Sequence, residues 1–346
     1  MGEAVLVFPA GSPDALAYRD RAKARGLRVI GASSVDHDPA QGGYDAWEHL
    51  PAVGDPDFDR SLTEILIRHE VTAVHTPLHA IWKHLAERLG EIAPGASLSG
   101  AHRDGDDHYQ ALRQRVANAR RPTFWAAFPP QPPLSDVERA GLLRLAQTVP
   151  GACGEEKMHA IIEVMRHAPQ GDIVEIGSAC GRSASLLLPL SQRYGLGKIL
   201  CIDPWDAASS PDGEDGEETL RMFEINLAPF AQGRLNFVRA RSDYFAPDYG
   251  PGLAVESEVF GATEYEGRIA VLHLDGGAAQ RQAQRDCDDW TPHLVGGGWI
   301  IFGGYQGSFG DGPKVVAAAF AAANERRIAA RFQAADALFI QLKRGA

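Results

Sequence analysis

The 346-residue sequence has few cysteines and no long hydrophobic segment, and both absences restrict what the chain can be. The four cysteines, Cys153, Cys180, Cys201 and Cys287, form no Cys-x-x-Cys pair, so neither a zinc knuckle nor a disulfide framework is expected. No window approaches the roughly 18 consecutive apolar residues of a transmembrane helix, so no membrane partner is expected. The N-terminal residues show no basic segment followed by a hydrophobic stretch, and we therefore expect a cytoplasmic location.

Positive charge is also scarce. The chain has 34 Lys and Arg against 45 Asp and Glu, which gives a net charge of -11. A nucleic-acid backbone would be repelled, and no basic stripe interleaved with aromatic residues offsets this, so no nucleic-acid partner is expected. The hydrophobic share of 45% and the charged share of 23% are typical of a folded chain.

A proline-rich segment interrupts the chain near its middle. Residues Arg120 to Ser135 contain five prolines in sixteen positions, and proline removes the backbone donor that helices and sheets need. We expect two domains and a linker, at residues 1–120, 134–346 and 121–133. Three aromatic residues of this segment are expected to lie against one domain surface: Phe124, Trp125 and Phe128.

Strand and helix patterns alternate on both sides of the prolines, which predicts an α/β fold with two Rossmann-like domains and parallel sheets. Strands are expected in the first domain at residues 4–10, 27–33 and 71–77. In the second domain they are expected at residues 173–176, 199–202, 235–238, 269–274, 299–302 and 337–342.

The most informative segment follows the first strand of the second domain. The strand leads into Gly177-x-x-x-Gly181 and then into a helix, so exposed backbone N–H groups can meet a ligand there. A dinucleotide fingerprint would need a glycine where Ala179 stands, and this substitution, together with Glu175, disfavours an NAD-dependent oxidoreductase. Asp203 ends the next strand, where a carboxylate can accept both hydroxyls of a ribose.

These features together resemble the class I S-adenosylmethionine-dependent methyltransferases. The similarity extends in order along Asp203-Pro204-Trp205, Asp275-Gly276, Asp289-Trp290 and Gly304-Tyr305. This order resembles the macrocin O-methyltransferase-type enzymes of the methyltransferase 24 group, over about residues 134–342. The resemblance implies a class I methyltransferase fold for the second domain, with S-adenosylmethionine as cofactor and S-adenosylhomocysteine as product.

The resemblance also implies a cofactor site. Its methionine end would be lined by Glu175, Gly177, Ser178, Gly181 and Ser183. The ribose would be held by Asp203, with Trp205 beside it, and the adenine would lie near Ser242 and Asp243, while Asp275 would face the transferring methyl group. The acceptor is expected to be a small natural-product-like or sugar-like molecule, methylated on oxygen.

The sequence departs from the metal-using members of this group. The sequences of those members resemble Asp-Gly-Asp-His after the fourth strand and Asp-Asp-Tyr after the fifth strand. This chain has Asp275-Gly-Gly-Ala and Gly303-Gly304-Tyr305 instead, and glycine offers no side-chain oxygen to Mg²⁺. No metal ligand is therefore expected.

Two interpretations of this departure stay open. In one, methyl transfer continues without metal, and Asp275 or Tyr305 takes the proton of the acceptor. In the other, the domain is a non-catalytic binding or scaffold protein with a degenerate methyltransferase fold. His273 alternates with leucines on a buried strand, so we expect a core histidine rather than a base.

The first domain resembles, over about residues 4–89, the α/β domain that precedes the nucleotide-binding part of ATP-grasp ligases. The catalytic ATP-grasp region does not follow it, so ligase activity is not expected. The resemblance implies a recognition or dimerisation module, which leaves a homo-oligomer open. His75 and His79 have metal-like spacing, but Pro77 between them interrupts the helix that would align them.

Overall fold

The computed structural model describes residues 3–100, 104–206, 215–277, 279–306 and 310–345, with the backbone alone for residues 104–108. The chain divides into two compact units, residues 1–111 and 112–346. This division lies within helix α4 (Asp104–Asn118), nine residues before the boundary expected from the prolines. No helix among the described residues has the length and apolar character needed to cross a lipid bilayer.

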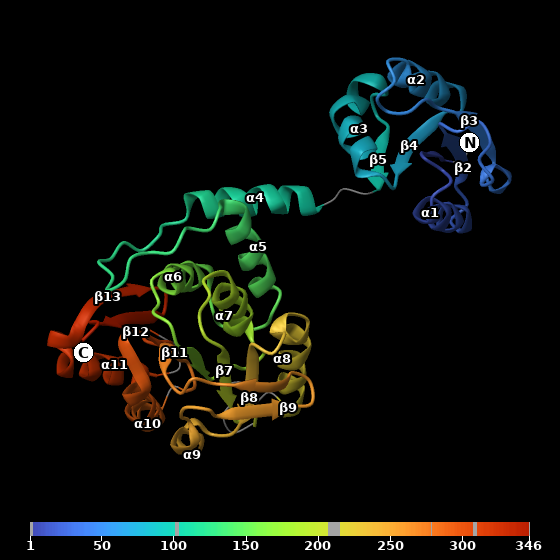
Figure 1. The fold of residues 1–346 in the computed structure, drawn as a ribbon. Coiled ribbons are helices and arrows are strands. Elements are labelled where there is room, and N and C mark those ends of the chain that lie inside the picture. The colour runs from blue at the N-terminus through green and yellow to red at the C-terminus, as the bar shows by residue number, and fades with distance from the viewer. Residues whose placement is uncertain (1–2, 101–103, 207–214, 278, 307–309, 346) are drawn as a thin grey trace. The chain divides into compact units, whose positions relative to one another are not determined.

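The first unit is built on a parallel sheet of five strands in the order β3-β2-β1-β4-β5. Its strands are β1 (Ala4–Val7), β2 (Arg28–Ser33), β3 (Ala46–His49), β4 (Val71–Thr76) and β5 (Ser97–Gly100). The helices that lie wholly within it are α1 (Pro13–Ala24), α2 (Phe58–Arg68) and α3 (His79–Ile92). Helix α1 packs on one face of the sheet and α2 and α3 pack on the other (Figure 1).

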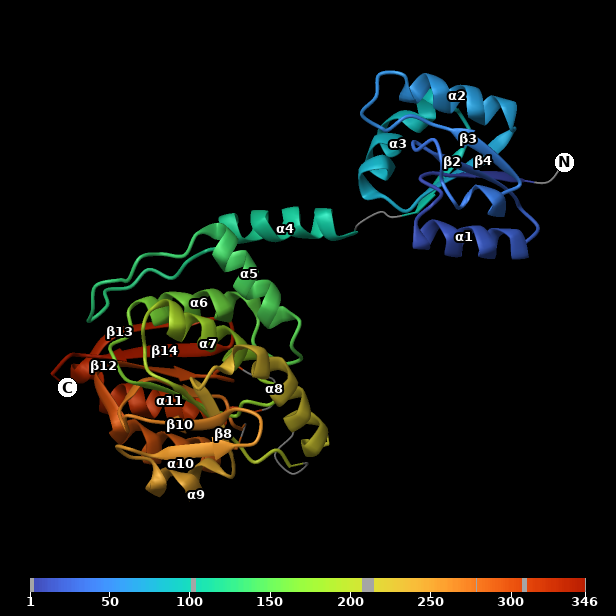
Figure 2. The same cartoon turned by 45° about the vertical axis from the view of Figure 1, so that its right-hand side comes forward.

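The second unit is built on a sheet of seven strands with helices on both faces (Figures 1 and 2). Its sheet strands are β6 (Asp172–Ile176), β7 (Ile199–Asp203), β8 (Leu235–Arg239), β11 (Ile269–Leu274), β12 (Leu294–Phe302), β13 (Ile328–Ala334) and β14 (Ala337–Leu342). A separate hairpin consists of β9 (Ala254–Ser257) and β10 (Gly261–Glu264). The helices are α5 (Asp136–Gln147), α6 (Glu155–Arg166), α7 (Arg182–Arg193), α8 (Gly216–Ala231), α9 (Ser242–Phe245), α10 (Gln280–Trp290) and α11 (Gly312–Ala323).

The strand order of this sheet is β13-β14-β12-β11-β6-β7-β8. Strands β8, β7, β6, β11 and β12 are parallel, whereas β14 is antiparallel to both β12 and β13. The order therefore reverses direction at β6 and β11, and in a parallel sheet the carboxyl edge at such a point is where ligands bind.

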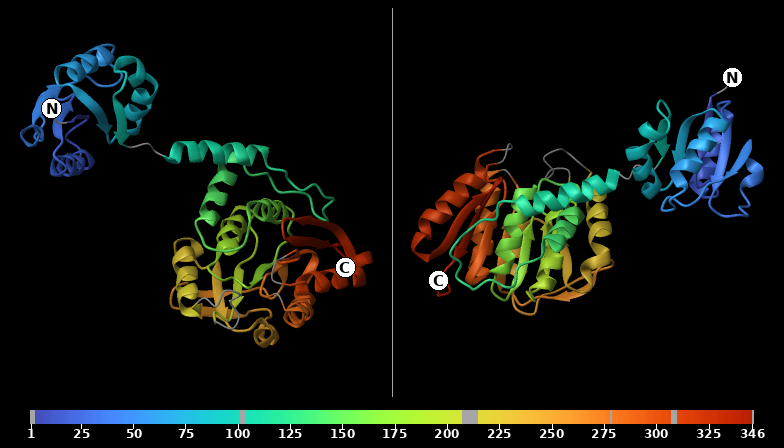
Figure 3. Two further views of the ribbon diagram at one scale, coloured as in Figure 1. Left: turned by 180° about the vertical axis from the view of Figure 1, so that it is seen from behind. Right: turned by 90° about the horizontal axis from the view of Figure 1, so that it is seen from above.

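Alternate residues of each strand point to opposite faces of the sheet, so the two helix layers bury different side chains. The layer with α5, α6 and α7 covers Ile173, Ile199 and Val271, and the layer with α10 and α11 covers Val174, Leu200 and Leu272 (Figure 3). By this alternation Glu175, His273 and Asp275 share the face covered by α6. Three residues that matter for the site therefore lie under one helix.

The proline-rich segment is not a free linker. It contains no helix or strand, but Ala127 N–H donates to Oε1 of Gln341 at 2.8 Å and Gln131 N–H donates to the Arg166 carbonyl at 2.9 Å. Phe124 stacks on Phe332, as expected for an aromatic residue held against a domain surface. The expectation was wrong for Trp125, which is 94% exposed.

Most expected elements are confirmed with small shifts at their ends. The sequence pattern missed β3, β5 and α3 in the first unit and β9, β10 and β13 in the second. Of these, β13 begins at Ile328, shortly after α11 ends at Ala323, and the sequence pattern did not separate the two. That error has a clear reason, because the residues of β13 alternate only partly between apolar and polar positions.

Candidate functional site at the carboxyl edge of the second sheet

The turn after β6 has the tight glycine-dependent backbone that the sequence indicated. Gly177 and Gly181 both have left-handed φ angles, of 84° and 86°, and Ala179 between them has a φ of 43°. A Cβ atom at Gly177 would lie 2.5 Å from the Asp275 carbonyl oxygen, so only glycine lets the turn approach the end of β11 this closely. The turn and Asp275 are therefore packed against each other.

Asp203, at the end of β7, is hydrogen bonded to this turn. Its Oδ2 accepts the Ala179 N–H at 3.0 Å and its Oδ1 accepts the Trp205 N–H at 2.8 Å. Burial raises the pKa of Asp203, although these backbone donors oppose the increase. Each carboxylate oxygen has a second lone pair, so the group can still accept hydroxyl protons from a ligand.

Trp205 is a core residue that supports the turn from below. Its indole is buried, packs at 5.0 Å between ring centroids on Phe223, and donates from Nε1 to the Ala179 carbonyl at 2.9 Å. The residue also has a left-handed φ of 44°. These contacts give Trp205 a structural role in holding the turn beside Asp203.

Two serines follow Gly177 along the turn and the start of α7. Ser178 is 3% exposed, and its Oγ has no hydrogen-bond partner among the described residues. Ser183 is also buried, in the first turn of α7. Gly181 is the N-cap of α7 and supplies no side-chain cap, so the first N–H groups of this helix remain available to a ligand.

Glu175, His273 and Asp275 lie side by side on β6 and β11. Glu175 and His273 are register partners without exposed area, and Oε1 of Glu175 lies 2.9 Å from Nδ1 of His273. His273 is thus the buried core histidine that the sequence indicated. The Asp275 side chain is 27% exposed, and its Oδ2 accepts a hydrogen bond at 2.7 Å from Nζ of Lys157 on α6.

The sequence reasoning missed Lys157. It lies on α6 at four and seven residues before Ile161 and Val164, and all three side chains are buried. A lysine at these positions of an apolar helix face is a signal, because a buried ammonium group needs a partner. The partner itself could not be identified from the sequence, because Asp275 is 118 residues away.

Ser242 and Asp243 lie on α9, and their side chains bind protein groups. The Ser242 hydroxyl donates to Oδ1 of Asp286 on α10. Asp243 accepts hydrogen bonds from Arg241 at 2.9 Å and Arg285 at 2.8 Å. The Arg241 hydrogen bond outweighs burial and holds the pKa of Asp243 below its usual value. Their expected position near the adenine of a cofactor stays a prediction.

Tyr305 follows β12 and is partly buried against the apolar cluster that α10 and α11 cover. Gly303 lies two residues before Tyr305 in the sequence. The backbone of Gly303 is in direct contact with Asp275, and a Cβ atom at this position would overlap the Asp275 carboxylate. The absence of a side chain at position 303 therefore provides the space in which Asp275 sits.

Residues 174–305 match the family model described as a methyltransferase domain, of the methyltransferase 24 type. The match begins within β6 and ends just after β12, so it contains the turn, Asp203, Asp275 and Tyr305. The seven-stranded order, with antiparallel β14 between β12 and β13, is that of the class I methyltransferases. The second unit therefore has the class I methyltransferase fold, and it is called the methyltransferase domain below.

Solved structures similar to the chain include O-methyltransferases. The O-methyltransferase NovP is 14% identical, with a TM-score of 0.38, and the similarity covers 70% of this chain and 100% of that chain. CalS11, a TDP-rhamnose 3'-O-methyltransferase of calicheamicin biosynthesis, is also 14% identical, with a TM-score of 0.38, covering 70% of this chain and 96% of that chain. A sequence comparison with curated proteins gives no match.

Side chains that could hold a metal ion do not come together in the methyltransferase domain as far as the structure describes it. No group of three His, Cys, Asp or Glu side chains has suitable positions among the described residues. Asp275 is already bound to Lys157, and the positions where the resemblance implies acidic residues in metal-using members are occupied by Gly277, Gly303 and Gly304. The donor set therefore does not fit Mg²⁺, which needs several oxygen ligands.

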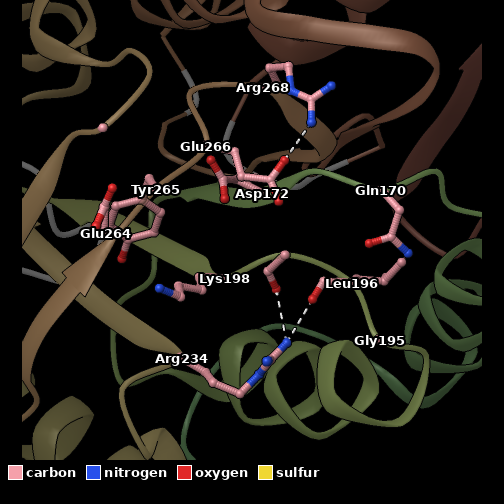
Figure 4. A pocket seen from close by; sticks show the side chains of 12 residues that line it. Gln170, Asp172, Gly195, Leu196, Lys198, Arg234, Glu264, Tyr265, Glu266 and Arg268 are labelled. Carbon is pink, nitrogen blue, oxygen red and sulfur yellow. Dashed lines mark hydrogen bonds and ion pairs between the residues drawn. The ribbon is translucent and has the colours of Figure 1, made fainter.

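A cavity of about 790 Å³ lies at the opposite, amino edge of the same sheet. Asp172 at the start of β6 lines it, with Lys198 and Arg268 just before β7 and β11 (Figure 4). One of its charged groups is bound to the protein itself, since Arg234 donates to the Leu196 carbonyl at 2.7 Å. We place the candidate site at the carboxyl edge, because the glycine turn, Asp203 and the uncapped end of α7 meet there.

Proposed function

We propose that the methyltransferase domain binds S-adenosylmethionine at the carboxyl edge of its sheet and transfers the methyl group to a hydroxyl oxygen of a small-molecule acceptor. The observation that carries this proposal is the hydrogen bond between the glycine turn and Asp203, with Ala179 N–H 3.0 Å from Oδ2. This hydrogen bond joins the glycine turn to Asp203, the two segments that the sequence predicts to bind different parts of the cofactor.

The residues of this edge suit the chemical groups of the cofactor. The unpartnered Oγ of Ser178 and the uncapped N–H groups of α7 would bind the methionine end, where a carboxylate is favoured by the helix terminus. Asp203 would accept the ribose hydroxyls. The cofactor supplies an activated methyl group, and the protein is left to align the acceptor oxygen with it and to exclude water.

We propose further that transfer proceeds without a bound metal ion. The three glycines at the expected ligand positions and the Lys157–Asp275 ion pair support this part of the proposal. A base must then take the proton of the acceptor, and Asp275 and Tyr305 are the two candidates near the end of β11 and β12. With a suitable acceptor, activity should be unchanged by a chelator. Loss of activity that Mg²⁺ restores would contradict metal independence.

The test of cofactor binding is a calorimetric titration of the full chain with S-adenosylhomocysteine. We expect measurable binding that Asp203→Ala weakens by about 1–3 kcal/mol, because ribose hydroxyls lose their acceptor. The matched control is Glu264→Ala, which removes an exposed carboxylate from the amino edge of the same domain. Absence of heat and of a melting-temperature shift at millimolar ligand would overturn the proposal.

A further inference from the structure

Four side chains of alternating acidic and basic type form a continuous row under helix α6: Glu175, His273, Asp275 and Lys157. Oε1 of Glu175 lies 2.9 Å from Nδ1 of His273, and Nε2 of His273 lies 3.4 Å from Oδ2 of Asp275. That same oxygen accepts the hydrogen bond from Nζ of Lys157 at 2.7 Å. Asp275 is the only member of this row whose side chain is more than 1% exposed.

Lys157 is 1% exposed and comes from an otherwise apolar helix face. Burial alone would favour the neutral amine, yet Asp275, Cys153 and Asp336 nearby outweigh it and raise the pKa of Lys157. Burial would likewise favour a neutral Asp275, but Lys157 and His273 outweigh it and lower the pKa of Asp275. Both partners are therefore ionised, and each depends on the other for its charge.

The surroundings of Asp275 already include a cationic group. Its Oδ2 faces Lys157 and His273, and its carboxylate rests against the backbone of Gly303 on the other side. A divalent ion at this carboxylate would lie within a few ångströms of the ammonium group, where like charges repel strongly in a partly buried site. The positions of Lys157 and of a metal ion are therefore mutually exclusive.

We propose that Lys157 is an internal counter-cation that occupies the place a divalent metal ion would need beside Asp275, and that it keeps Asp275 an oriented carboxylate anion at the site. Lys157 acts through Asp275 and is a positioning residue. The inference rests on the proposed function for its role at the cofactor site. It assigns Asp275 the part of a fixed negative charge, which leaves Tyr305 as the candidate base.

The test is whether a cation from solution can replace Lys157. Lys157→Ala removes the ammonium group and opens a space beside an uncompensated carboxylate, so the variant should gain an Mn²⁺ site detected by electron paramagnetic resonance. We expect Mn²⁺ to bind this variant at least about tenfold more tightly than the wild type, as removal of a close like charge implies. Ethylammonium should also raise its melting temperature. Both gains should vanish in Lys157→Ala/Asp275→Asn.

The matched control is Lys198→Ala, which removes a lysine at the amino edge of the same sheet and should gain no Mn²⁺ site. The inference is overturned if the wild type binds Mn²⁺ in a manner that Asp275→Asn abolishes, or if folded Lys157→Ala gains neither cation. If Lys157→Ala does not fold, Lys157→Met replaces it, because methionine keeps most of the side-chain volume. The inference then requires the double variant Lys157→Met/Asp275→Asn to melt at a higher temperature than Lys157→Met. These readouts need no methyl donor. Failure of S-adenosylhomocysteine binding in the wild type would thus overturn the proposed function separately.

Discussion

Each unit contains a strand that leads through a turn into a helix, β1 into α1 and β6 into α7, but the two turns end in opposite ways. In the first unit Ser12 is the N-cap of α1, its Oγ accepts the Ala15 N–H at 3.2 Å, and Pro13 occupies the first helical turn. In the methyltransferase domain the N-cap of α7 is Gly181, without a side-chain cap. One turn caps its helix end with its own side chain, while the other provides no side-chain cap. The same supersecondary unit therefore serves as scaffold in one domain and as candidate site in the other.

The glycines of the two turns should differ most in their tolerance of a side chain. Gly177→Ala combines a left-handed φ with a Cβ atom 2.5 Å from a backbone oxygen, so we expect it to lower the unfolding free energy by about 3–4 kcal/mol. Gly11→Ala meets only the carboxylate end of Asp38, which can move, and should cost about 1 kcal/mol or less. Chemical denaturation, monitored in each unit by hydrogen exchange, measures the loss of stability in both variants. Equal losses would show that the turns do not differ as described.

The second-largest difference between the two units is expected in the loss of stability in mild acid. His75 on β4 is stacked on Tyr18, and burial, assisted by Arg21, lowers the pKa of His75 from 6.5 to about 4. Between these values the unfolded chain binds a proton that the folded unit does not. Stability of the first unit is thus retained above pH 6.5 and falls by about 3 kcal/mol as the pH drops towards 4.

Hydrogen exchange of the β1 and β4 amides at pH 7 and pH 4.5 measures this loss. The control is His75→Phe, which keeps a ring against Tyr18 but cannot titrate. If the variant lost as much stability in acid as the wild type, another group would be responsible.

The smallest expected effects are those of replacing one serine in each turn. Ser12→Ala removes the cap of α1 and should destabilise the first unit by about 1 kcal/mol without effect on ligand binding. Ser178→Ala removes a buried hydroxyl that has no hydrogen-bond partner among the described residues, so stability should be unchanged or rise by about 1 kcal/mol. It should, however, weaken S-adenosylhomocysteine binding. Thermal melting and calorimetry together decide this, and a clear loss of stability in Ser178→Ala would refute the assignment of Ser178 to the ligand.

Much of the fold and part of the site could be predicted from the sequence, because the signals were local. The strand before Gly177, the glycine turn and Asp203 lie within about thirty residues and carry short-range patterns of hydrophobicity and glycine. Strand β13 was missed because its burial alternates irregularly, and the β9–β10 hairpin because its strands are short and mostly exposed.

The sequence could not reveal what depends on long-range contacts. Lys157 is defined by a partner on another element, and the role of Gly303 becomes clear only where β12 lies beside Asp275. Trp205 shows the same limit, since a residue next to Asp203 in sequence is also part of the core below the turn, and its expected place beside the ribose stays a prediction. Adjacent residues in a loop can face different environments, and only the folded backbone separates them.

The most direct test of the central claim is hydrogen exchange of the full chain with and without saturating S-adenosylhomocysteine. We predict that the ligand slows exchange in residues 177–186 and 203–206, where the uncapped turn and Asp203 would bind it, and leaves residues 8–16 of the first unit unchanged. Unchanged exchange in residues 177–186, or equal protection of both turns, would contradict the account.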